Sequence, residues 1–138
     1  MICDTSGILS ALSADQPHHT ESAIALRNAN ARLVSPMVLT EVEYLASLRL
    51  GQRVAGQILQ VLSGPEYEIL RFTGETARAA WEVMTTYVDL DLGFVDAALV
   101  IHARDMGTDD ILTLDQKHFR AVRSLSGRHF RLLPFDMV

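Results

Sequence analysis

Apolar residues along the chain follow two patterns that alternate, short continuous runs and longer segments with helical spacing. The short runs are typical of buried strands and are expected at residues 2–4, 32–34, 67–72, 111–114 and 129–133. Between them, apolar positions three and four residues apart predict helices over residues 5–13, 15–31, 36–50, 52–63, 75–87, 94–106 and 116–122. Strands that alternate with helices predict an α/β fold, a mostly parallel central sheet with helices on both faces.

Several helix boundaries are marked by residues with capping preferences. Ser35 followed by Pro36 is typical of a helix start, and Thr73 is expected to cap the helix that begins near Glu75. Pro17 is expected in the first turn of the second helix, and Gly107 is expected to end the helix that begins after Gly93.

The helix over residues 36–50 carries two acids with different expected orientations. Its apolar stripe is expected to consist of Val38, Val42, Leu45 and Leu48. Glu41 projects to the flank of that stripe, whereas Glu43 points further round toward solvent. Glu41 is therefore a candidate site residue, and the alternative is a partly exposed acid that pairs with an arginine.

Three further acids are set in unusual positions. Asp4 and Asp115 each follow a predicted strand, at the carboxyl end where open α/β sheets place their chemistry. Asp96 lies in an apolar helix close to Leu99 and Val100, where an unpaired carboxylate is costly to bury unless a cation meets it. The alternatives are that Asp4 only caps the next helix and that Asp96 is only a helix-start acid.

These four carboxylates together suggest a metal site. Hard oxygen donors without histidine suit Mg²⁺ or Mn²⁺, and like charges cannot gather closely unless a cation neutralises them or protons bind. Such a site commonly serves phosphoryl chemistry, because the ion lowers the pKa of a bound water and stabilises charge on the phosphate.

The sequence motifs of nucleotide-binding, aspartyl-phosphate and zinc sites are absent from the chain. The turn after the first strand reads DTSG, which has no dinucleotide-binding glycine pattern, and the chain has no Walker loop. An aspartyl-phosphate phosphatase would need an acid at Ser6, and a zinc site would need clusters of histidine or cysteine. His18 and His19 are expected to be solvated near the start of the second helix.

Composition indicates a cytoplasmic globular domain. The chain has 138 residues, 49% of them hydrophobic, and no run long enough to cross a bilayer, so we expect no membrane association. Met1 to Asp4 does not resemble a signal peptide, and the single Cys3, expected in the core, fits a reducing compartment.

Charge is unevenly distributed, although the net charge is −5. The segment from Lys117 to Arg131 contains basic residues and no acid, namely Lys117, Arg120, Arg123, Arg128 and Arg131. This segment is a candidate for contact with nucleic-acid phosphates, and its alternative is a solvated surface.

Four motifs together resemble a known family. They are DTSG at residues 4–7, SPMVLTEVEYL at 35–45, YVDLDLGFVDA at 87–97 and TLDQKHF at 113–119. They resemble the PIN-domain ribonucleases, and within these the VapC-type toxins of bacterial toxin–antitoxin pairs, over nearly the whole length. The resemblance implies one PIN domain over residues 1–138.

The same resemblance implies an activity, residues and partners. The family's acidic quartet matches Asp4, Glu41, Asp96 and Asp115, with Asp4, Asp96 and Asp115 as metal ligands and Ser6 and Thr113 as supporting hydroxyls. It implies Mg²⁺- or Mn²⁺-dependent endonucleolytic cleavage of RNA that leaves 5′-phosphate and 3′-hydroxyl ends, a homodimer, and inhibition by a cognate VapB-type antitoxin.

Some questions stay open at this point. A PIN nuclease of RNA maturation or of DNA, or a non-catalytic module that holds a structural ion, would share these residues. The RNA could be a transfer RNA, a ribosomal RNA loop or a messenger RNA. Four further acids are unassigned, namely Asp89, Asp91, Asp109 and Asp110.

Overall fold

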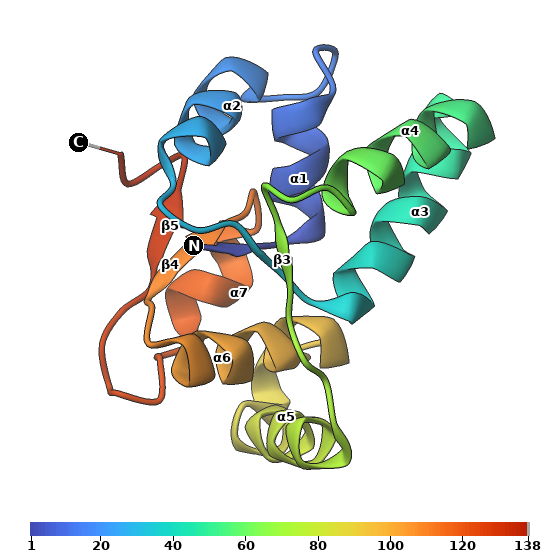
Figure 1. Ribbon diagram of the computed structural model, residues 1–138. Coiled ribbons are helices and arrows are strands. Elements are labelled where there is room, and N and C mark those ends of the chain that lie inside the picture. The colour runs from blue at the N-terminus through green and yellow to red at the C-terminus, as the bar shows by residue number, and fades with distance from the viewer. Residues whose placement is uncertain (138) are drawn as a thin grey trace.

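The computed structural model describes residues 1–137, and its centre is a parallel β-sheet (Figure 1). Within those residues the sheet has five strands in the order β3-β2-β1-β4-β5, and every neighbouring pair is parallel. The strands are β1 (Ile2–Cys3), β2 (Leu33–Val34), β3 (Glu68–Ile69), β4 (Asp110–Leu112) and β5 (Arg131–Leu133). The predicted α/β fold with a parallel sheet is thus confirmed.

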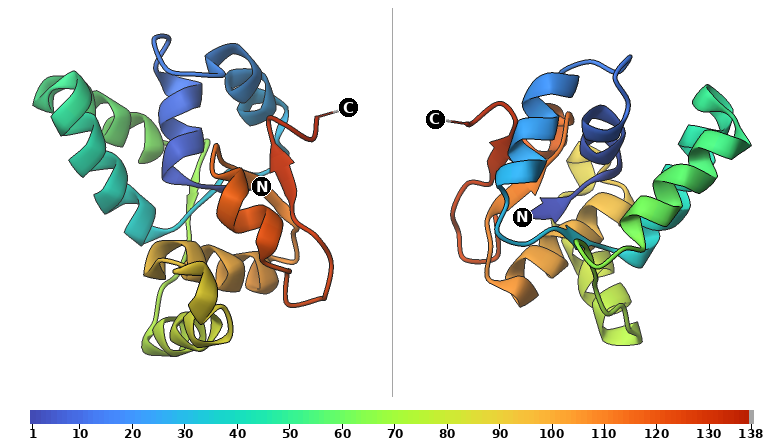
Figure 2. Two further views of the ribbon diagram at one scale, coloured as in Figure 1. Left: turned by 180° about the vertical axis from the view of Figure 1, so that it is seen from behind. Right: turned by 45° about the horizontal axis from the view of Figure 1, so that its top comes forward.

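Helices cover both faces of this sheet (Figures 1 and 2). On one side lie α1 (Thr5–Leu12) and α2 (His19–Asn28), flanked by the antiparallel pair α3 (Pro36–Leu50) and α4 (Gln52–Leu62). On the other side lie α5 (Gly74–Thr86), α6 (Phe94–Met106) and α7 (Gln116–Ala121), with the 3₁₀ turn η1 (Val88–Leu90) before α6. Right-handed crossovers require this division, because the chain moves toward β3 first and then returns past β1. None of the helices within residues 1–137 is both long and apolar enough to cross a bilayer.

The strand order reverses direction between β1 and β4. From β1 the chain adds β2 and β3 on one side, then crosses to β4 on the other side. In open α/β sheets, ligands bind outside the carboxyl ends of the strands at such a switch point. Asp4 directly follows β1, and Thr113 to Asp115 directly follow β4, so this edge carries two of the predicted site segments.

The core lies between the sheet and its helices, and Cys3 is buried in it as expected. Burial raises the pKa of Cys3 to about 12, so its thiol stays protonated. Gly7 lets α1 approach β4 closely, because a Cβ atom at this position would collide with the backbone carbonyl of Leu112. The start of α1 is thereby held against the end of β4. Gly107 ends α6 with φ 65°, as expected.

Two predicted helix features are wrong. The second helix begins at His19, because Asp15 to Pro17 form a turn in which the N–H of Gln16 donates to the carbonyl of Ser13. Leu48 does not belong to a buried stripe, since 67% of it is exposed. The buried residues of α3 are Val38, Val42 and Ala46, and the far end of the α3–α4 pair projects away from the sheet (Figure 1).

The third strand is also shorter and more exposed than expected. It covers Glu68–Ile69 rather than residues 67–72, and both of its residues are exposed. It is the edge strand of the sheet, which has a neighbour on one side within the described residues. Leu70, which follows it, is buried in the core, and Tyr67 and Phe72 pack against that core while partly buried.

Candidate metal centre

Asp4 stands at the carboxyl end of β1 and is 5% exposed. One oxygen, Oδ1, accepts a hydrogen bond from the N–H of Thr5 (2.7 Å), so Asp4 also caps α1. The other, Oδ2, accepts from the hydroxyls of Thr113 (2.7 Å) and Ser6 (3.1 Å). Burial raises the pKa of Asp4 above its ordinary value, while these three hydrogen bonds favour the charged form.

Two hydroxyl groups, those of Ser6 and Thr113, connect the end of β1 to the end of β4 through hydrogen bonds. The Ser6 hydroxyl accepts a hydrogen bond from the N–H of Leu114 (2.9 Å), and the Thr113 hydroxyl accepts one from the N–H of Asp115 (3.0 Å). Both hydroxyls also contact Asp4. The two residues that the resemblance implied as supporting hydroxyls therefore orient Asp4 and fix the backbone that leads to Asp115.

Glu41 reaches the same edge from α3. Its Oε1 accepts a short hydrogen bond from the hydroxyl of Thr5, which is itself buried. Glu43, two residues on, instead accepts from Ser47 in its own helix (3.0 Å). The two glutamates thus point to different neighbours, and it is Glu41 that faces α1.

A buried histidine fixes the start of the helix that carries Glu41. His102 on α6 forms a hydrogen bond through Nε2 with the hydroxyl of Ser35, the N-cap residue of α3 (3.0 Å). Burial lowers the pKa of His102, so its ring is neutral. The contact ties α3 to α6, the helix that also carries Asp96.

Asp96 lies in the first turn of α6, with 21% of its side chain exposed. Burial of the carboxyl group, followed by the charges of Asp4 and Asp115, raises the pKa of Asp96 to about 7. Glu41 adds a smaller effect in the same direction, and His118 opposes it. Asp4, Glu41 and Asp115, from three other segments of the chain, are therefore close enough for their charges to raise the pKa of Asp96.

Asp115 caps α7 and forms a close pair with His118. Its Oδ1 accepts from the N–H of His118 (3.0 Å), and its Oδ2 lies 2.7 Å from Nδ1 of the same residue. His118 Nδ1 is also 3.8 Å from Oδ2 of Asp96. The hydrogen bond to Asp115 raises the pKa of His118. Ligand atoms of Asp96, Asp115 and His118 all lie within 4.8 Å of one another.

This donor set fits a hard divalent cation. The four acids are Asp4, Glu41, Asp96 and Asp115. Within residues 1–137, the ion pairs that they make involve His118 and no lysine or arginine. Carboxylate oxygens suit Mg²⁺ or Mn²⁺. Among the residues described, the group whose ligand atoms lie within 4.8 Å of one another does not include Asp4. The charge of Asp4 nevertheless raises the pKa of Asp96, and its hydrogen bonds are made with Thr5, Ser6 and Thr113.

The basic segment is spread over the molecule rather than gathered at these acids. Arg120 makes a bidentate pair with Asp136 (2.7 Å for both contacts), and Arg131 pairs with Asp110 (2.7 Å). Arg128 pairs with Asp109, just before β4, at the opposite edge of the sheet. Lys117 is exposed in the first turn of α7, two residues after Asp115, and Arg123 is exposed beyond the end of that helix.

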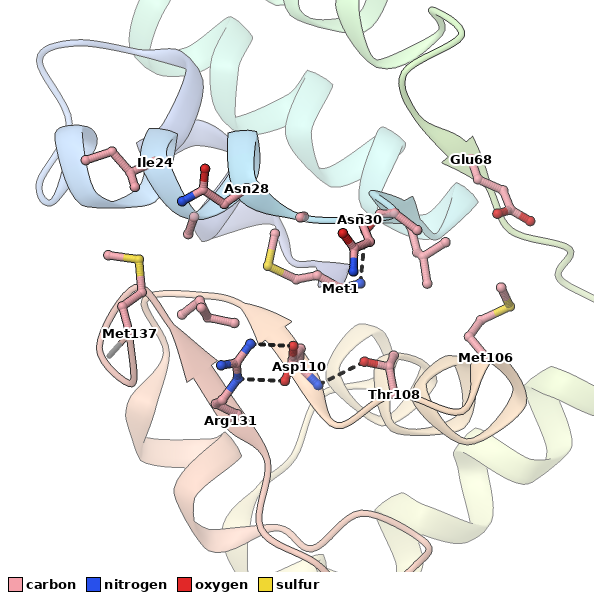
Figure 3. A pocket seen from close by; sticks show the side chains of 15 residues that line it. Met1, Ile24, Asn28, Asn30, Glu68, Met106, Thr108, Asp110, Arg131 and Met137 are labelled. Carbon is pink, nitrogen blue, oxygen red and sulfur yellow. Dashed lines mark hydrogen bonds and ion pairs between the residues drawn. The ribbon is translucent and has the colours of Figure 1, made fainter.

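The amino edge of the sheet holds the cavity drawn in Figure 3. Its volume is about 660 Å³, against about 530 Å³ for the hollow beside Glu41. Asp110 and Arg131 line the cavity at the amino edge, and Figure 3 shows the two contacts that join them. Asp109 and Asp110 thus have arginine partners at this edge, while Asp89 and Asp91 are exposed in or beside η1. Among the residues described, Asp96 and Asp115, whose ion pairs involve no arginine, lie at the other edge, although the cavity here is larger.

Two residues of the site were not expected from the sequence. His118 follows Asp115 by three positions, and this spacing at a helix start places the two side chains side by side, so the signal was present in TLDQKHF. Thr5 gave no signal, because its partner Glu41 is distant in the chain and only packing of α1 against α3 joins them.

Comparisons with known proteins give a consistent picture. A family model described as "PIN domain" matches residues 1–125. The chain is 35% identical over 135 residues to Ribonuclease VapC26 of Mycobacterium tuberculosis, covering 97% of this chain and 100% of that protein.

Two solved structures share the fold. The first is Mycobacterium tuberculosis VapC20, described as a Sarcin-Ricin loop cleaving toxin, with a TM-score of 0.78, 22% identity, and coverage of 83% of this chain and 89% of that one. The second is VapBC2 from Rickettsia felis bound to a DNA fragment from their promoter, with a TM-score of 0.67, 20% identity, and coverage of 90% and 93%.

Proposed function

The chain belongs to the PIN domain family, and from that premise we propose that it is a metal-dependent endoribonuclease, the toxin of a type II toxin–antitoxin system. The observation that carries the proposal is the group of four acids at the switch point of the sheet, whose ion pairs within residues 1–137 involve no lysine or arginine. The similarity to Ribonuclease VapC26 over nearly the full length supports the ribonuclease assignment.

Asp4, Asp96 and Asp115 would hold the ion, which we propose to be Mg²⁺ or Mn²⁺. When bound, the ion would lower the pKa of a water and stabilise charge on the phosphate. The hydroxyls of Ser6 and Thr113 orient the Asp4 carboxylate by donating hydrogen bonds to its Oδ2. Glu41, held by Thr5, would orient the attacking water or help to hold a second ion, and the products would carry 5′-phosphate and 3′-hydroxyl ends.

Lys117 is our first candidate for contact with the RNA backbone. It is exposed two residues after Asp115, so its ammonium group can reach a phosphate beside the acids. Arg123 is a second candidate, and Arg120 could contribute only by leaving or sharing Asp136. Arg128, paired with Asp109 at the other edge, is unsuited to this role.

A hollow beside Glu41 supports the proposal of a VapB-type antitoxin. It is lined mainly by apolar surface of Met37, Tyr44 and Val95, and further along α3 and α4 the side chains of Leu48 and Val61 are exposed. An apolar face of a partner helix could cover this surface and block Glu41. We also propose a homodimer that acts in the cytoplasm, which light scattering and fractionation would test.

The proposal is tested by incubating metal-free protein with total RNA and mapping the new ends. Mg²⁺ or Mn²⁺ should support cleavage, EDTA should abolish it, and Ca²⁺ should substitute poorly because it prefers longer, less regular coordination. Asp4→Asn should remove cleavage, while Asp109→Asn, an acid at the other edge, should not. Undiminished cleavage in EDTA would contradict the metal mechanism, and cleavage of DNA in preference to RNA would contradict the substrate.

A further inference from the structure

His118 holds both oxygens of one acid of the site. Its backbone N–H donates to Oδ1 of Asp115 (3.0 Å), and its ring Nδ1 lies 2.7 Å from Oδ2. The backbone contact is the ordinary N-cap interaction of a helix start and needs no histidine. The ring contact is additional, and it fixes the second oxygen of the carboxylate.

The ring also links the two elements that carry Asp115 and Asp96. Nδ1 is 3.8 Å from Oδ2 of Asp96. With 23% of its side chain exposed, His118 sits between Asp115, which caps α7, and Asp96 in the first turn of α6. It therefore bridges two carboxylates that would otherwise repel one another.

We propose that His118 is a positioning residue, whose ring sets the orientation of Asp115 and its spacing from Asp96 for metal binding, without being a ligand itself. This inference rests on the proposed metal-dependent function of the site. Nδ1 is engaged with Asp115, which leaves the carboxylates as the donors, and these suit Mg²⁺ or Mn²⁺. Partners that orient a ligand in this way typically change metal affinity about 10–100-fold.

The test is calorimetric titration of Mn²⁺ into the metal-free protein and its variants. His118→Phe removes the donor while keeping a ring, and Mn²⁺ affinity should fall about 10–100-fold. His118→Asn places an amide nitrogen the same number of bonds from Cβ as Nδ1, so it should recover most of the affinity. His118→Ala provides a second donor-free variant if the phenylalanine is not accommodated.

His129→Phe is the matched control, because His129 is exposed and lies outside the acid group. It should leave Mn²⁺ affinity unchanged.

Each alternative result has a distinct meaning. Unchanged affinity in folded His118→Phe and His118→Ala would overturn the positioning role. If Mn²⁺ affinity stays low in His118→Asn, and this variant loses more affinity for Zn²⁺ than for Mg²⁺, the ring is a metal ligand. That result would also overturn the positioning role. Failure of the unaltered protein to bind Mn²⁺ would instead refute the proposed function, and the inference with it.

Discussion

Acidic side chains stand at both edges of the sheet, but their partners differ. At the amino edge, Asp109 and Asp110 meet the guanidinium groups of Arg128 and Arg131. At the carboxyl edge, the ion pairs that Asp96 and Asp115 make within residues 1–137 involve His118 alone.

This difference separates acids that support structure from acids that are available for chemistry. The arginine pairs are half-exposed, and pairs of this kind contribute about 0–1 kcal/mol each. The acids at the carboxyl edge are partly buried and repel one another, which is why the pKa of Asp96 rises to about 7. A site whose negative charge is offset in part by His118 gains from a bound cation, whereas an acid already paired with arginine gains little.

The largest expected effect is that of Asp96→Asn. Removing this charge should lower RNA cleavage by at least about a hundredfold, since even partners of ligands cost 10–100-fold. Metal-free stability should hold or rise, because repulsion with Asp4 and Asp115 is relieved. The thermal shift on adding Mg²⁺ should shrink, because a ligand stabilises only through its affinity for the fold.

Thermal melts of both proteins in EDTA and then in Mg²⁺ measure these effects. A lower metal-free melting temperature with an undiminished Mg²⁺ shift would show that Asp96 is structural, and it would then resemble the acids of the amino edge.

A comparison of Glu41→Gln with Glu43→Gln tests whether RNA cleavage requires the negative charge of Glu41. Glutamine keeps an oxygen that can accept from Thr5 at position 41 or from Ser47 at position 43, so α3 should stay folded in both variants. We expect the first change to remove most RNA cleavage and the second to leave it nearly intact. The opposite ranking in a cleavage assay would mean that Glu41 serves only to hold Thr5.

Stability of the metal-free protein should depend on pH in a definite direction. In the unfolded chain Asp96 ionises near 3.8, whereas in the fold it keeps its proton up to about 7. Between these values the folded state binds more protons, so the free energy of unfolding falls as pH rises toward about 7. The raised pKa of His118 acts in the same direction, since its contribution is lost as pH rises through its folded value.

Urea titrations between about pH 5 and pH 7, within the window that the two pKa values of Asp96 set, would measure this slope. Asp96→Asn should flatten it, and saturating Mg²⁺ should abolish the contribution of Asp96, because the ion displaces the proton that the folded state otherwise holds. A slope that Asp96→Asn leaves unchanged would assign the pH dependence to other groups.

The smallest expected effect compares basic residues at the two edges. Lys117→Gln should weaken RNA binding and reduce the log–log salt slope by somewhat less than one unit, as expected for one lost phosphate contact. Arg128→Gln should leave the slope unchanged, because Arg128 is paired with Asp109 away from the acids. Equal slopes for all three proteins, measured by fluorescence anisotropy, would leave Lys117 as solvated surface.

Much of the fold could be predicted from the sequence, because the signals were local. The apolar runs of the buried strands, the Ser35 cap and the Gly107 stop each depend on a few adjacent residues. The errors occurred where burial depended on distant neighbours. Leu48 has helical spacing but projects beyond the sheet, and Ile69 has strand character but lies on an edge strand.

The sequence by itself determined which residues are chemically suited to the candidate site. It placed Asp4 and Asp115 after buried strands and Asp96 in an apolar helix, because such positions follow from periodicity alone. The tertiary structure decided the charge environment. It joined Thr5 to Glu41 across two helices, and it gave arginine partners to Asp109 and Asp110 but not, within residues 1–137, to Asp96 or Asp115. Electrostatic interactions depend on distance in space, which the order of residues in a chain does not contain.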